Sequence, residues 1–403
     1  MATAYLVAGL GYGDEGKGAT VDFLARDLGA RLVVRYNGGA QAGHNVVTPN
    51  GNHHTFSQFG SGMFVPGVWT YLSKYMMVNP LNMMLEEEAL RSLGVRNAFK
   101  RTLVDKRSLI TTPFQSAVNK VLLKVSGKNN SCGMGIGQTR EDHIKYGDAV
   151  VFAGDIRSKD PHLLKMKLRL LQSVSFEKVR KYLNNVYIQE TFPGILDLFL
   201  STKSVDDLAS DYDEWPVGIV GNAMEAFDIL DLTGTPRKNV IFEGAQGVLL
   251  DEEFGEEGFN TWTKTTFHNC ASILDEAIWQ GSSLRIGVLR TYMTRHGDGP
   301  LPTKETDWFP SEKHNVSDGA QGKFRKSNFS FEAVDKALKI CGGVDIFALN
   351  HFDELVNPVI VEGLEKRAPV SIVGMGPTAD DRRWTQNPDV DIKNGGIAWT
   401  AKS

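Results

Sequence analysis

The sequence predicts an α/β protein, with a single large domain over residues 1–403 built around a mostly parallel central sheet. The first reason is that short apolar runs typical of buried strands recur along the chain, and most of them end in a glycine-rich loop. The second is that helical spacing of apolar residues fills the segments between them, without sequence repeats, low-complexity tracts or a clear interdomain linker. The expected strands cover residues 5–8, 32–36, 239–242, 284–289, 344–349 and 370–373.

The composition is that of an ordinary globular protein with a sizeable core, since 41% of its 403 residues are hydrophobic. The formal net charge of -4 argues against a nucleic-acid-binding surface and leaves small anionic substrates to local positive sites. The three cysteines, Cys132, Cys270 and Cys341, lack the spacing of a disulfide framework or a zinc site. No stretch approaches the roughly 18 apolar residues of a membrane span. We therefore expect a cytoplasmic protein without membrane or nucleic-acid partners.

The first glycine-rich loop, residues 9–18, lies between the first strand and a helical run over residues 20–28. Its glycines fit the GxGxxG pattern of dinucleotide sites, but that interpretation needs an acidic residue after the next strand, where Asn37-Gly38-Gly39 stands. They also fit GxxxxGK, and only this second pattern accounts for Lys17. We therefore predict a phosphate loop whose backbone N–H groups cradle phosphates while Lys17 reaches the outer ones.

Magnesium binding at this loop needs an unusual ligand. A phosphate loop normally has Ser or Thr after the lysine to hold the metal, and Gly18 cannot do so. Asp14 is the nearest candidate to replace it. A second glycine-rich loop, residues 38–44, follows the second strand, so both loops leave the carboxyl ends of strands, where open α/β sheets bind ligands. We expect His44 to face Asp14 across one crevice and to act as an acid or base.

Four further segments are considered as sources of ligand contacts. The strand over residues 239–242 ends in a glycine-rich loop with Gln246 placed to hydrogen-bond a ligand. Residues 260–266 offer hydroxyls and one cation, which suits a phosphate monoester or a plain polar turn. The Gly- and Ser/Asn-rich segment 127–142 fits an anion nest and a mobile surface loop equally well. Residues 50–62 are expected to form a solvated polar loop without a role.

The tetrapeptide Asn350-His351-Phe352-Asp353 follows a late buried strand and resembles the NKxD motif by which GTP-binding proteins recognise guanine, with His in place of Lys. A carboxylate accepts from guanine N1–H and N2–H together, whereas adenine has no N1–H to offer. The last strand runs into Gly374-Met375-Gly376-Pro377, which we expect to close over the same base. This end of the chain therefore predicts the base-binding part of a GTP site.

Two regions are expected to surround the site. Residues 157–232 show mainly the pattern of amphipathic helices and are predicted to form a scaffold covering the sheet. Residues 311–328 are basic and are predicted to form a mobile substrate loop in which Lys323, Arg325 and Lys326 clamp a carboxylate. A solvated charged loop is the alternative for that segment.

Taken together, these segments resemble the adenylosuccinate synthetase family. The stretches YGDEGKG, RYNGGAQAGHN, FEGAQGVLLD, TRHGDGPLPT and GMGP match that family's motifs in order and spacing across nearly the whole chain. The resemblance implies a single α/β domain with a phosphate-loop-related GTP site, a homodimer and Mg²⁺ as cofactor. It also implies the reaction of GTP, IMP and L-aspartate to give GDP, phosphate and adenylosuccinate.

The resemblance also implies roles for individual residues. Asp14 resembles the family's catalytic base, which takes the purine N1 proton and also binds magnesium. His44 resembles the family's acid, which stabilises charge on the γ-phosphate. The implied catalytic residues are Asp14, His44, Lys17 and Gln246, and the implied metal ligands are Asp14 and the Gly43 carbonyl. The implied GTP contacts are Gly13, Asp14, Glu15, Gly16, Lys17, Gly18, Gly43, His44, Asn350, His351, Asp353, Gly374 and Gly376. The implied monophosphate contacts are Asn37, Gln41, Ser131, Cys132, Gln246 and Thr261, and the implied aspartate contacts are Gln321, Lys323 and Arg325.

The sequence departs from the family pattern mostly in the substrate sites. Gln41 replaces an Asn, Ser131-Cys132 replaces a Thr pair, and a shortened segment, residues 320–326, replaces the family's Thr-Thr-Gly and arginines. An arginine that crosses the family's dimer falls near Tyr146. The acceptor nucleotide therefore stays open between IMP and another 6-oxopurine nucleotide such as dGMP, although Asp14 speaks against the phage branch that uses dGMP. A GTP-binding protein without catalysis is the third hypothesis.

Overall fold

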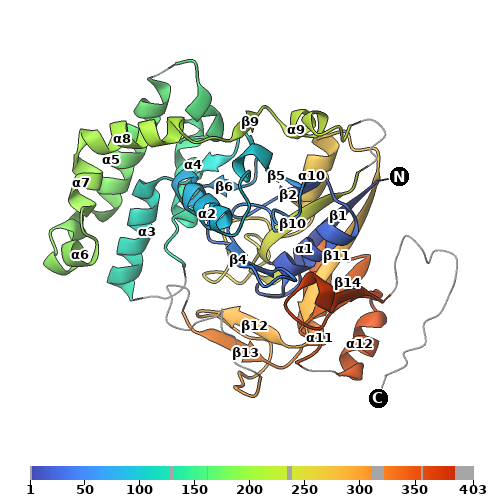
Figure 1. The fold of residues 1–403 in the computed structure, drawn as a ribbon. Coiled ribbons are helices and arrows are strands. Elements are labelled where there is room, and N and C mark those ends of the chain that lie inside the picture. The colour runs from blue at the N-terminus through green and yellow to red at the C-terminus, as the bar shows by residue number, and fades with distance from the viewer. Residues whose placement is uncertain are drawn as a thin grey trace.

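The structure is a computed structural model, and it describes residues 2–127, 131–160, 162–233, 238–309, 322–354 and 357–385. Within this part of the chain, ten strands form one sheet in the order β16-β15-β14-β11-β1-β10-β2-β5-β7-β9 (Figure 1). Neighbouring strands pair in parallel except for β15 and β16, which are antiparallel at one edge. The predicted α/β fold around a mostly parallel sheet is therefore confirmed.

The sheet strands follow the predicted apolar runs closely, because residues buried on both faces of a parallel sheet must be apolar almost throughout. Its middle strand is β1, in which every residue after Thr3 is buried. In spatial order the strands are β16 (Arg382–Trp384), β15 (Val370–Gly374), β14 (Ile346–Asn350), β11 (Ser282–Arg290), β1 (Thr3–Gly9), β10 (Val240–Gly247), β2 (Leu32–Arg35), β5 (Trp69–Leu72), β7 (Thr102–Asp105) and β9 (Gly218–Val220). The short strands β5, β7, β9 and β16 were not predicted.

The two faces of the sheet are covered by different helices. Leu6 of β1 belongs to a core shared with α9 (Ala223–Ile229), α10 (His268–Glu276), α11 (Phe331–Cys341) and α12 (Pro358–Glu365). The neighbouring residue Val7 points to the other face and packs in a core with α1 (Lys17–Asp27). This alternation follows from the two-residue period of a strand. The loop over residues 10–16 joins the carboxyl end of β1 to the N-terminus of α1.

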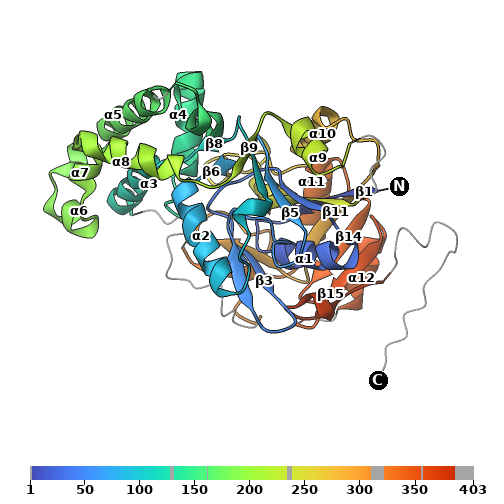
Figure 2. The same ribbon diagram turned by 45° about the horizontal axis from the view of Figure 1, so that its top comes forward.

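The segment predicted as a helical scaffold is helical, but most of it stands beside the sheet. The helices α5 (Leu163–Leu183), α6 (Val186–Thr191), α7 (Ile195–Leu200) and α8 (Thr202–Asp213) lie beyond the β9 edge in both views (Figures 1 and 2). They share a separate hydrophobic core with α3 (Pro113–Ser126). The described helices α2 (Pro80–Ser92) and α4 (Ile136–Tyr146) also contribute to that core.

Among the described residues, three small strand pairs lie outside the main sheet. They are β3 (His44–Val47) with β4 (His53–Phe56), β12 (Met293–His296) with β13 (Phe324–Ser327), and β6 (Met77–Val78) with β8 (Leu109–Ile110). The β4 strand contradicts the prediction of a solvated loop over residues 50–62. His54 is only 8% exposed and lies 3.7 Å from a carboxylate oxygen of Glu86, which is itself buried. His54 is therefore buried by contacts with residues distant in sequence, although the local sequence is polar.

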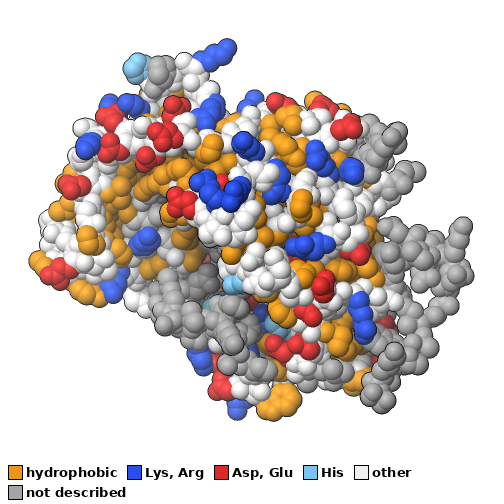
Figure 3. Space-filling view, in the orientation of Figure 1, with side chains coloured by type: hydrophobic (Ala, Val, Ile, Leu, Met, Phe, Trp, Pro, Cys, Tyr) orange, Lys and Arg blue, Asp and Glu red, His pale blue; other side chains and the backbone are white. Residues whose placement is uncertain are grey.

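The visible surface carries charges of both signs. Lys and Arg side chains are interspersed with Asp and Glu across the face seen in Figure 3. Among the described residues, no helix has the length and apolar character needed to cross a membrane.

Candidate active site

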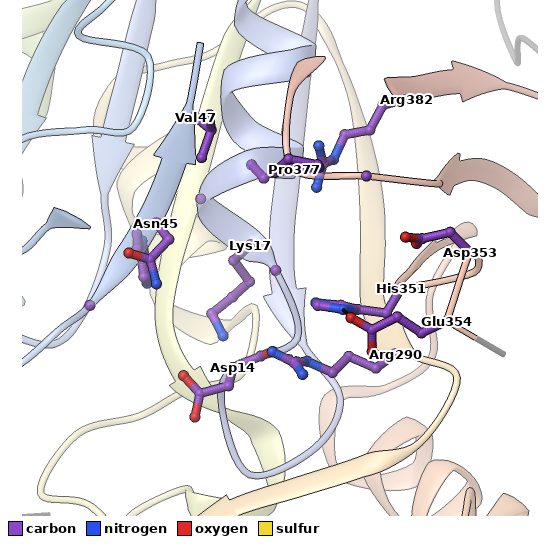
Figure 4. A pocket seen from close by; sticks show the side chains of 16 residues that line it. Asp14, Lys17, Asn45, Val47, Arg290, His351, Asp353, Glu354, Pro377 and Arg382 are labelled. Atoms are coloured by element: carbon purple, nitrogen blue, oxygen red, sulfur yellow. Dashed lines mark hydrogen bonds and ion pairs between the residues drawn. The ribbon is translucent and has the colours of Figure 1, made fainter. Parts of the chain in front are cut away.

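A cavity of about 240 Å³ lies where β1, β11, β14 and β15 end, beside the first turn of α1 (Figure 4). It brings together parts of the chain that the sequence separates by more than 300 residues. The predicted site residues that line it are Asp14, Gly16, Lys17, Gly18, Gly43, His44, His351, Asp353 and Gly376. Pro377, from the segment predicted to close over the base, also lines it, and the lining residues that were not predicted are Ala19, Asn45, Val47, Arg290, Glu354 and Arg382.

The phosphate loop is organised around the buried carboxylate of Glu15. The backbone N–H groups of Gly11 and Gly13 donate to Glu15 Oε1 at 3.0 and 2.8 Å, and Lys17 Nζ lies 2.6 Å from Oε2. Both charged side chains are buried, with Lys17 4% exposed. Glu15 therefore supports the loop from beneath, and it is not among the residues that line the cavity. A phosphate entering the cavity would compete with Glu15 for the Lys17 ammonium group.

The glycines of the loop have identifiable steric causes. Gly16 has φ 89°, in the left-handed region, and a side chain there would also meet Asn350. A Cβ at Gly18 would lie 2.8 Å from the Cβ of His44. The backbone of His44 and Asn45 lies almost as close, at 3.0 and 3.1 Å, so a side chain at position 18 would require this segment to shift. The close packing of residues 44 and 45 therefore disfavours the usual Ser or Thr.

Backbone strain gathers at the loops that were predicted to bind substrate. Among the described non-glycine residues, five have positive φ, and three of them are Asp14 (61°), Gln246 (64°) and His351 (57°). Each follows or ends a parallel strand of the main sheet. Strained conformations of this kind persist only where the surroundings enforce them, and they concentrate at functional sites. All three positions lie in loops that were singled out from the sequence, whereas the other two, Asp231 and Ile278, do not.

His44 is held by a buried carboxylate that sequence analysis did not single out. Its Nδ1 lies 2.6 Å from Oε1 of Glu243, a fully buried residue on β10. The Ser61 amide donates to Glu243 Oε2 at 2.9 Å, and the Ser61 hydroxyl donates to Oε1. Arg35, also fully buried, supplies a nearby positive charge.

These contacts decide the protonation of the pair. Burial alone would raise the pKa of Glu243, but His44, Arg35 and the hydrogen bonds outweigh it and lower the pKa to about 2. Burial lowers the pKa of His44 below its ordinary value. An ionised Glu243 can only accept, so His44 carries its proton on Nδ1 and has Nε2 left for a ligand. This is the orienting carboxylate–histidine arrangement of many acid–base sites.

Two further residues that were not predicted contact Asp14. Nε2 of His296, at the end of β12, lies 3.4 Å from Asp14 Oδ2. Nε of Arg290, which ends β11, donates to the backbone carbonyl of Asp14. The His296 ring packs against Phe324 with 4.9 Å between ring centroids. Asp14 is therefore held by its backbone and by its side chain, although it belongs to a loop.

The opposite end of the cavity contains the residues predicted to bind a base. His351 Nδ1 lies 3.0 Å from a carboxylate oxygen of Glu354. The side chains of His351 and Asp353 both point into the cavity (Figure 4). Asn350 instead holds the structure together, since its Nδ2 donates to the Glu15 carbonyl at 2.9 Å and to Thr20 Oγ1 at 3.1 Å. It therefore links the base end to the phosphate loop. The carbonyl of Gly374 accepts from the Phe352 amide at 3.0 Å, which has the same stabilising effect.

The predicted monophosphate residues do not line this cavity. Asn37 exchanges two hydrogen bonds with the Ala245 backbone, at 2.7 and 3.1 Å, and so positions the loop that carries Gln246. Ser131 donates to Asn119 Oδ1 at 3.0 Å. The remaining predicted contacts, Gln41, Cys132 and Thr261, are partly buried and lie outside helices and strands. Their roles toward a second nucleotide stay predictions.

The predicted aspartate residues are engaged within the protein. Arg325 donates from Nε to the Gly297 carbonyl at 2.8 Å and from Nη2 to the Gly299 carbonyl at 2.7 Å. Lys323 Nζ lies 2.6 Å from Glu305, and its side chain is 60% exposed. Gln321 and residues 311–320 of the predicted substrate loop lie outside the described residues. Arg325 thus stabilises the loop that follows His296.

The predicted metal ligands Asp14 and Gly43 line the same cavity. Within the described part of the chain, no three His, Cys, Asp or Glu side chains form a metal-binding group. This donor set fits Mg²⁺, which is commonly held by one or two protein groups together with substrate phosphates and water.

The fold and the cavity define a class of protein. A GxxxxGK loop at the N-terminus of a helix, facing an Asn-x-x-Asp loop after a later parallel strand, is the arrangement of nucleoside-triphosphate-binding α/β enzymes. The family model of adenylosuccinate synthetase matches residues 6–358, and the chain belongs to this family. It is therefore a GTP-dependent C–N ligase that joins aspartate to a purine nucleotide.

Comparisons with individual proteins agree with this assignment. The chain is 27% identical over 380 residues to adenylosuccinate synthetase of Clostridium beijerinckii, covering 90% of this chain and 79% of that protein. It is 28% identical over 367 residues to the Haemophilus influenzae enzyme, covering 88% and 78%. The similarity thus extends across most of each chain.

Two solved structures share the fold. Fully ligated adenylosuccinate synthetase from Plasmodium falciparum superposes with a TM-score of 0.72 at 18% identity, covering 95% of this chain and 99% of the other. Cyanophage S-2L succinoaminodeoxyadenylate synthetase (PurZ), bound to dGMP and to dATP as an energy donor, gives a TM-score of 0.66 at 19% identity, covering 96% of both chains. At these identities the likeness concerns the fold alone.

Proposed function

We propose that the protein joins the amine of L-aspartate to C6 of IMP, using GTP and releasing GDP and phosphate, to form adenylosuccinate. The observation that carries this proposal is that Asp14, Lys17 and His44 share one cavity with Asp353. These side chains supply a base, a phosphate-binding cation, an oriented imidazole and a guanine-binding carboxylate. The two relatives named adenylosuccinate synthetase support IMP as the acceptor.

The chemistry requires activation of the purine oxygen. Asp14 takes the proton from N1, so that O6 gains electron density and attacks the γ-phosphorus of GTP while the bond to the GDP oxygen breaks. The aspartate amine then adds to C6, the phosphate departs with the former O6, and the amine loses a proton. Lys17 and the loop amides offset the negative charge that accumulates on the phosphates.

His44 would stabilise the transferred phosphoryl group. Because Nδ1–H is donated to Glu243, only Nε2 can serve the substrate, and it donates only when the ring is protonated. The negative charge of a bound phosphate opposes the effect of burial and favours that protonated form. Asp14 and the Gly43 carbonyl would hold Mg²⁺, which supplies charge neutralisation between the phosphates. We also propose that the protein is cytoplasmic, forms a homodimer and folds as a single domain.

The test is a phosphate-release assay with L-aspartate, GTP, Mg²⁺ and a panel of IMP, dIMP, GMP and dGMP. We expect turnover with IMP to exceed turnover with GMP and dGMP by at least about tenfold. Purified full-length protein without aspartate serves as the control, because the ligase should then release little phosphate. The absence of turnover with every acceptor would contradict the proposal and favour a binding-only protein.

A second candidate acceptor is dGMP. The substitutions at Gln41 and Ser131-Cys132 affect the predicted monophosphate site, and the PurZ structure shares the fold. Turnover with dGMP above that with IMP in the same panel would select this alternative. The dGMP reaction should be assayed with dATP as well as with GTP as the phosphate donor, because PurZ was solved with dATP as its energy donor.

His296 is expected to position the Asp14 carboxylate. Replacing His296 by Ala removes the contact at 3.4 Å, and we expect kcat to fall about tenfold with KM for GTP nearly unchanged. His296→Gln keeps a donor and should restore part of the rate. The exposed His162 on the remote helical segment provides the control substitution His162→Ala. Equal loss of activity in the Ala and Gln variants would argue against positioning by a hydrogen bond.

A further inference from the structure

Arg382 is a buried cation at the base end of the nucleotide cavity, and the family motifs do not include it. It begins β16, the antiparallel strand at the edge of the sheet, and lines the cavity together with Gly376 and Pro377. Arg382 is 8% exposed, whereas the next residue, Arg383, is exposed. This difference follows from the alternation of side chains along a strand. Arg382 therefore faces inward by the geometry of its strand.

The guanidinium group of Arg382 is only partly satisfied by the protein. Nη1 donates to the Thr378 carbonyl at 2.6 Å, while Nε is buried and has no hydrogen-bond partner among the described residues. Burial lowers the pKa of Arg382 to about 10, so the group stays charged at neutral pH. Buried donors are nearly always paired, and a charged one left unpaired is costly. Because Nε itself has almost no accessible surface, the outer guanidinium nitrogens are the atoms suited to donate to a ligand in the cavity that Arg382 lines.

The surroundings of Arg382 place it with the base and not with the phosphates. Asp22, Asp381 and Asp353 are the carboxylates whose charges act on it. In Figure 4 Arg382 and Asp353 extend into the same end of the cavity, away from Asp14. A positive donor and a negative acceptor therefore flank one position.

This pair matches the Watson–Crick edge of guanine. Guanine presents an acceptor, O6, next to the N1–H and N2–H donors, whereas adenine presents an amino donor next to an N1 acceptor. Asp353 suits the donors of guanine, and a cationic donor suits O6. Adenine would direct its amino group at Arg382 and its N1 at Asp353, which is unfavourable at both positions. We propose that Arg382 recognises O6 of the guanine of GTP and, with Asp353, determines the preference for GTP over ATP.

The experiment measures equilibrium binding of GDP, IDP, ADP and 6-thio-GDP to the full-length protein by calorimetry, with Mg²⁺ and without acceptor. It rests on the proposed GTP site but needs no turnover. We expect the unaltered protein to bind GDP and IDP at least about tenfold more tightly than ADP. 6-Thio-GDP keeps N1–H and the 2-amino group but replaces O6 by a poorer acceptor, and it should bind about tenfold more weakly than GDP.

Arg382→Met keeps most of the side-chain volume and removes the donors. It should weaken GDP and IDP by the same factor, about 10- to 100-fold, leave ADP nearly unchanged and abolish the difference between GDP and 6-thio-GDP. Arg383→Met, on the opposite side of the strand, is the matched control and should change none of these affinities. Equal weakening of GDP and ADP, or a 6-thio-GDP penalty that survives in Arg382→Met, would overturn the proposal.

The ligand series keeps the inference testable if Arg382→Met does not fold. In that case equal binding of GDP and 6-thio-GDP to the unaltered protein refutes recognition of O6. Failure of the unaltered protein to bind either GDP or ADP would instead refute the nucleotide site itself. Normal GDP binding without turnover on any acceptor would leave recognition by Arg382 intact and contradict only the ligase reaction.

Discussion

Replacing Asp14 by Asn is expected to lower phosphate release about 1,000-fold while GTP binding survives. The amide cannot take the N1 proton of the acceptor purine, so O6 is not activated. The backbone should tolerate the change, because Asp14 has φ 61° and Asn is among the residues that enter this left-handed region most readily. Phosphate release with saturating substrates measures the first effect, and calorimetric titration with GTP measures the second.

Asp228→Asn provides the control for charge removal, since Asp228 is exposed on α9 far from the cavity. Its activity and unfolding midpoint should match those of the unaltered protein. Retained turnover in Asp14→Asn would rule out Asp14 as the base. A loss of GTP binding that parallels the loss of turnover would show that Asp14 acts through magnesium or nucleotide binding.

The elements that could be predicted are those whose sequence pattern is enforced locally. Parallel strands buried on both faces must be apolar, and this made β1, β10, β11, β14 and β15 recognisable. The phosphate loop was recognisable because Gly16 needs a left-handed backbone and Lys17 needs a fixed place after it. The missing hydroxyl at Gly18 was also visible, but its steric cause, the Cβ of His44, depends on the fold.

The residues that prediction missed make contacts over long sequence separations. Glu243 and His44 are 199 residues apart, and their pairing depends on the placement of β10 near the β3 hairpin. A signal was available, since a charged residue at the end of an apolar strand before a glycine-rich loop must find a buried partner. His296 had a weaker signal within TRHGDG, and Arg382 had none beyond its place after the Gly-Pro turn.

Some polar residues were assigned to ligands although the protein itself satisfies them. Asn37 is engaged by Ala245, and Arg325 by the carbonyls of Gly297 and Gly299. A motif alone cannot separate a residue that positions a loop from one that contacts a ligand. The hydrogen bonds indicate positioning of the neighbouring loops, and they predict that substitution here would disturb stability as well as substrate binding.

Replacing Glu243 by Gln is expected to lower turnover about 100-fold and to destabilise the protein. The neutral amide could no longer orient His44 by charge, and the buried Arg35 would lose its compensating carboxylate. Because folding lowers the pKa of Glu243 to about 2, its ionised form contributes to stability at neutral pH. Urea unfolding at pH 7 measures this loss, with the exposed Glu362→Gln as the control.

The contribution of Glu243 to the free energy of unfolding should depend on pH. A carboxyl group with a lowered pKa stabilises the folded state above its unfolded pKa, and this contribution disappears as the pH falls from about 4.5 through about 2. His44, whose pKa is also lowered, adds a loss of stability that begins near pH 6.5, because the unfolded chain then binds a proton more readily. The stability difference between the unaltered protein and Glu243→Gln should therefore shrink as the pH falls below about 4.5. A constant difference would contradict an ionised Glu243.

A double substitution separates the catalytic and structural contributions of this pair. If Glu243 acts on turnover through His44, then Glu243→Gln in a His44→Gln background should cause almost no further loss of kcat, although it still leaves Arg35 without its carboxylate and lowers stability. Independent effects would multiply instead, and about another 100-fold would be lost. Near-equal kcat values for the single His44→Gln and the double variant would show that a carboxylate outside the cavity serves the reaction by holding the imidazole, while His44 itself meets the phosphate.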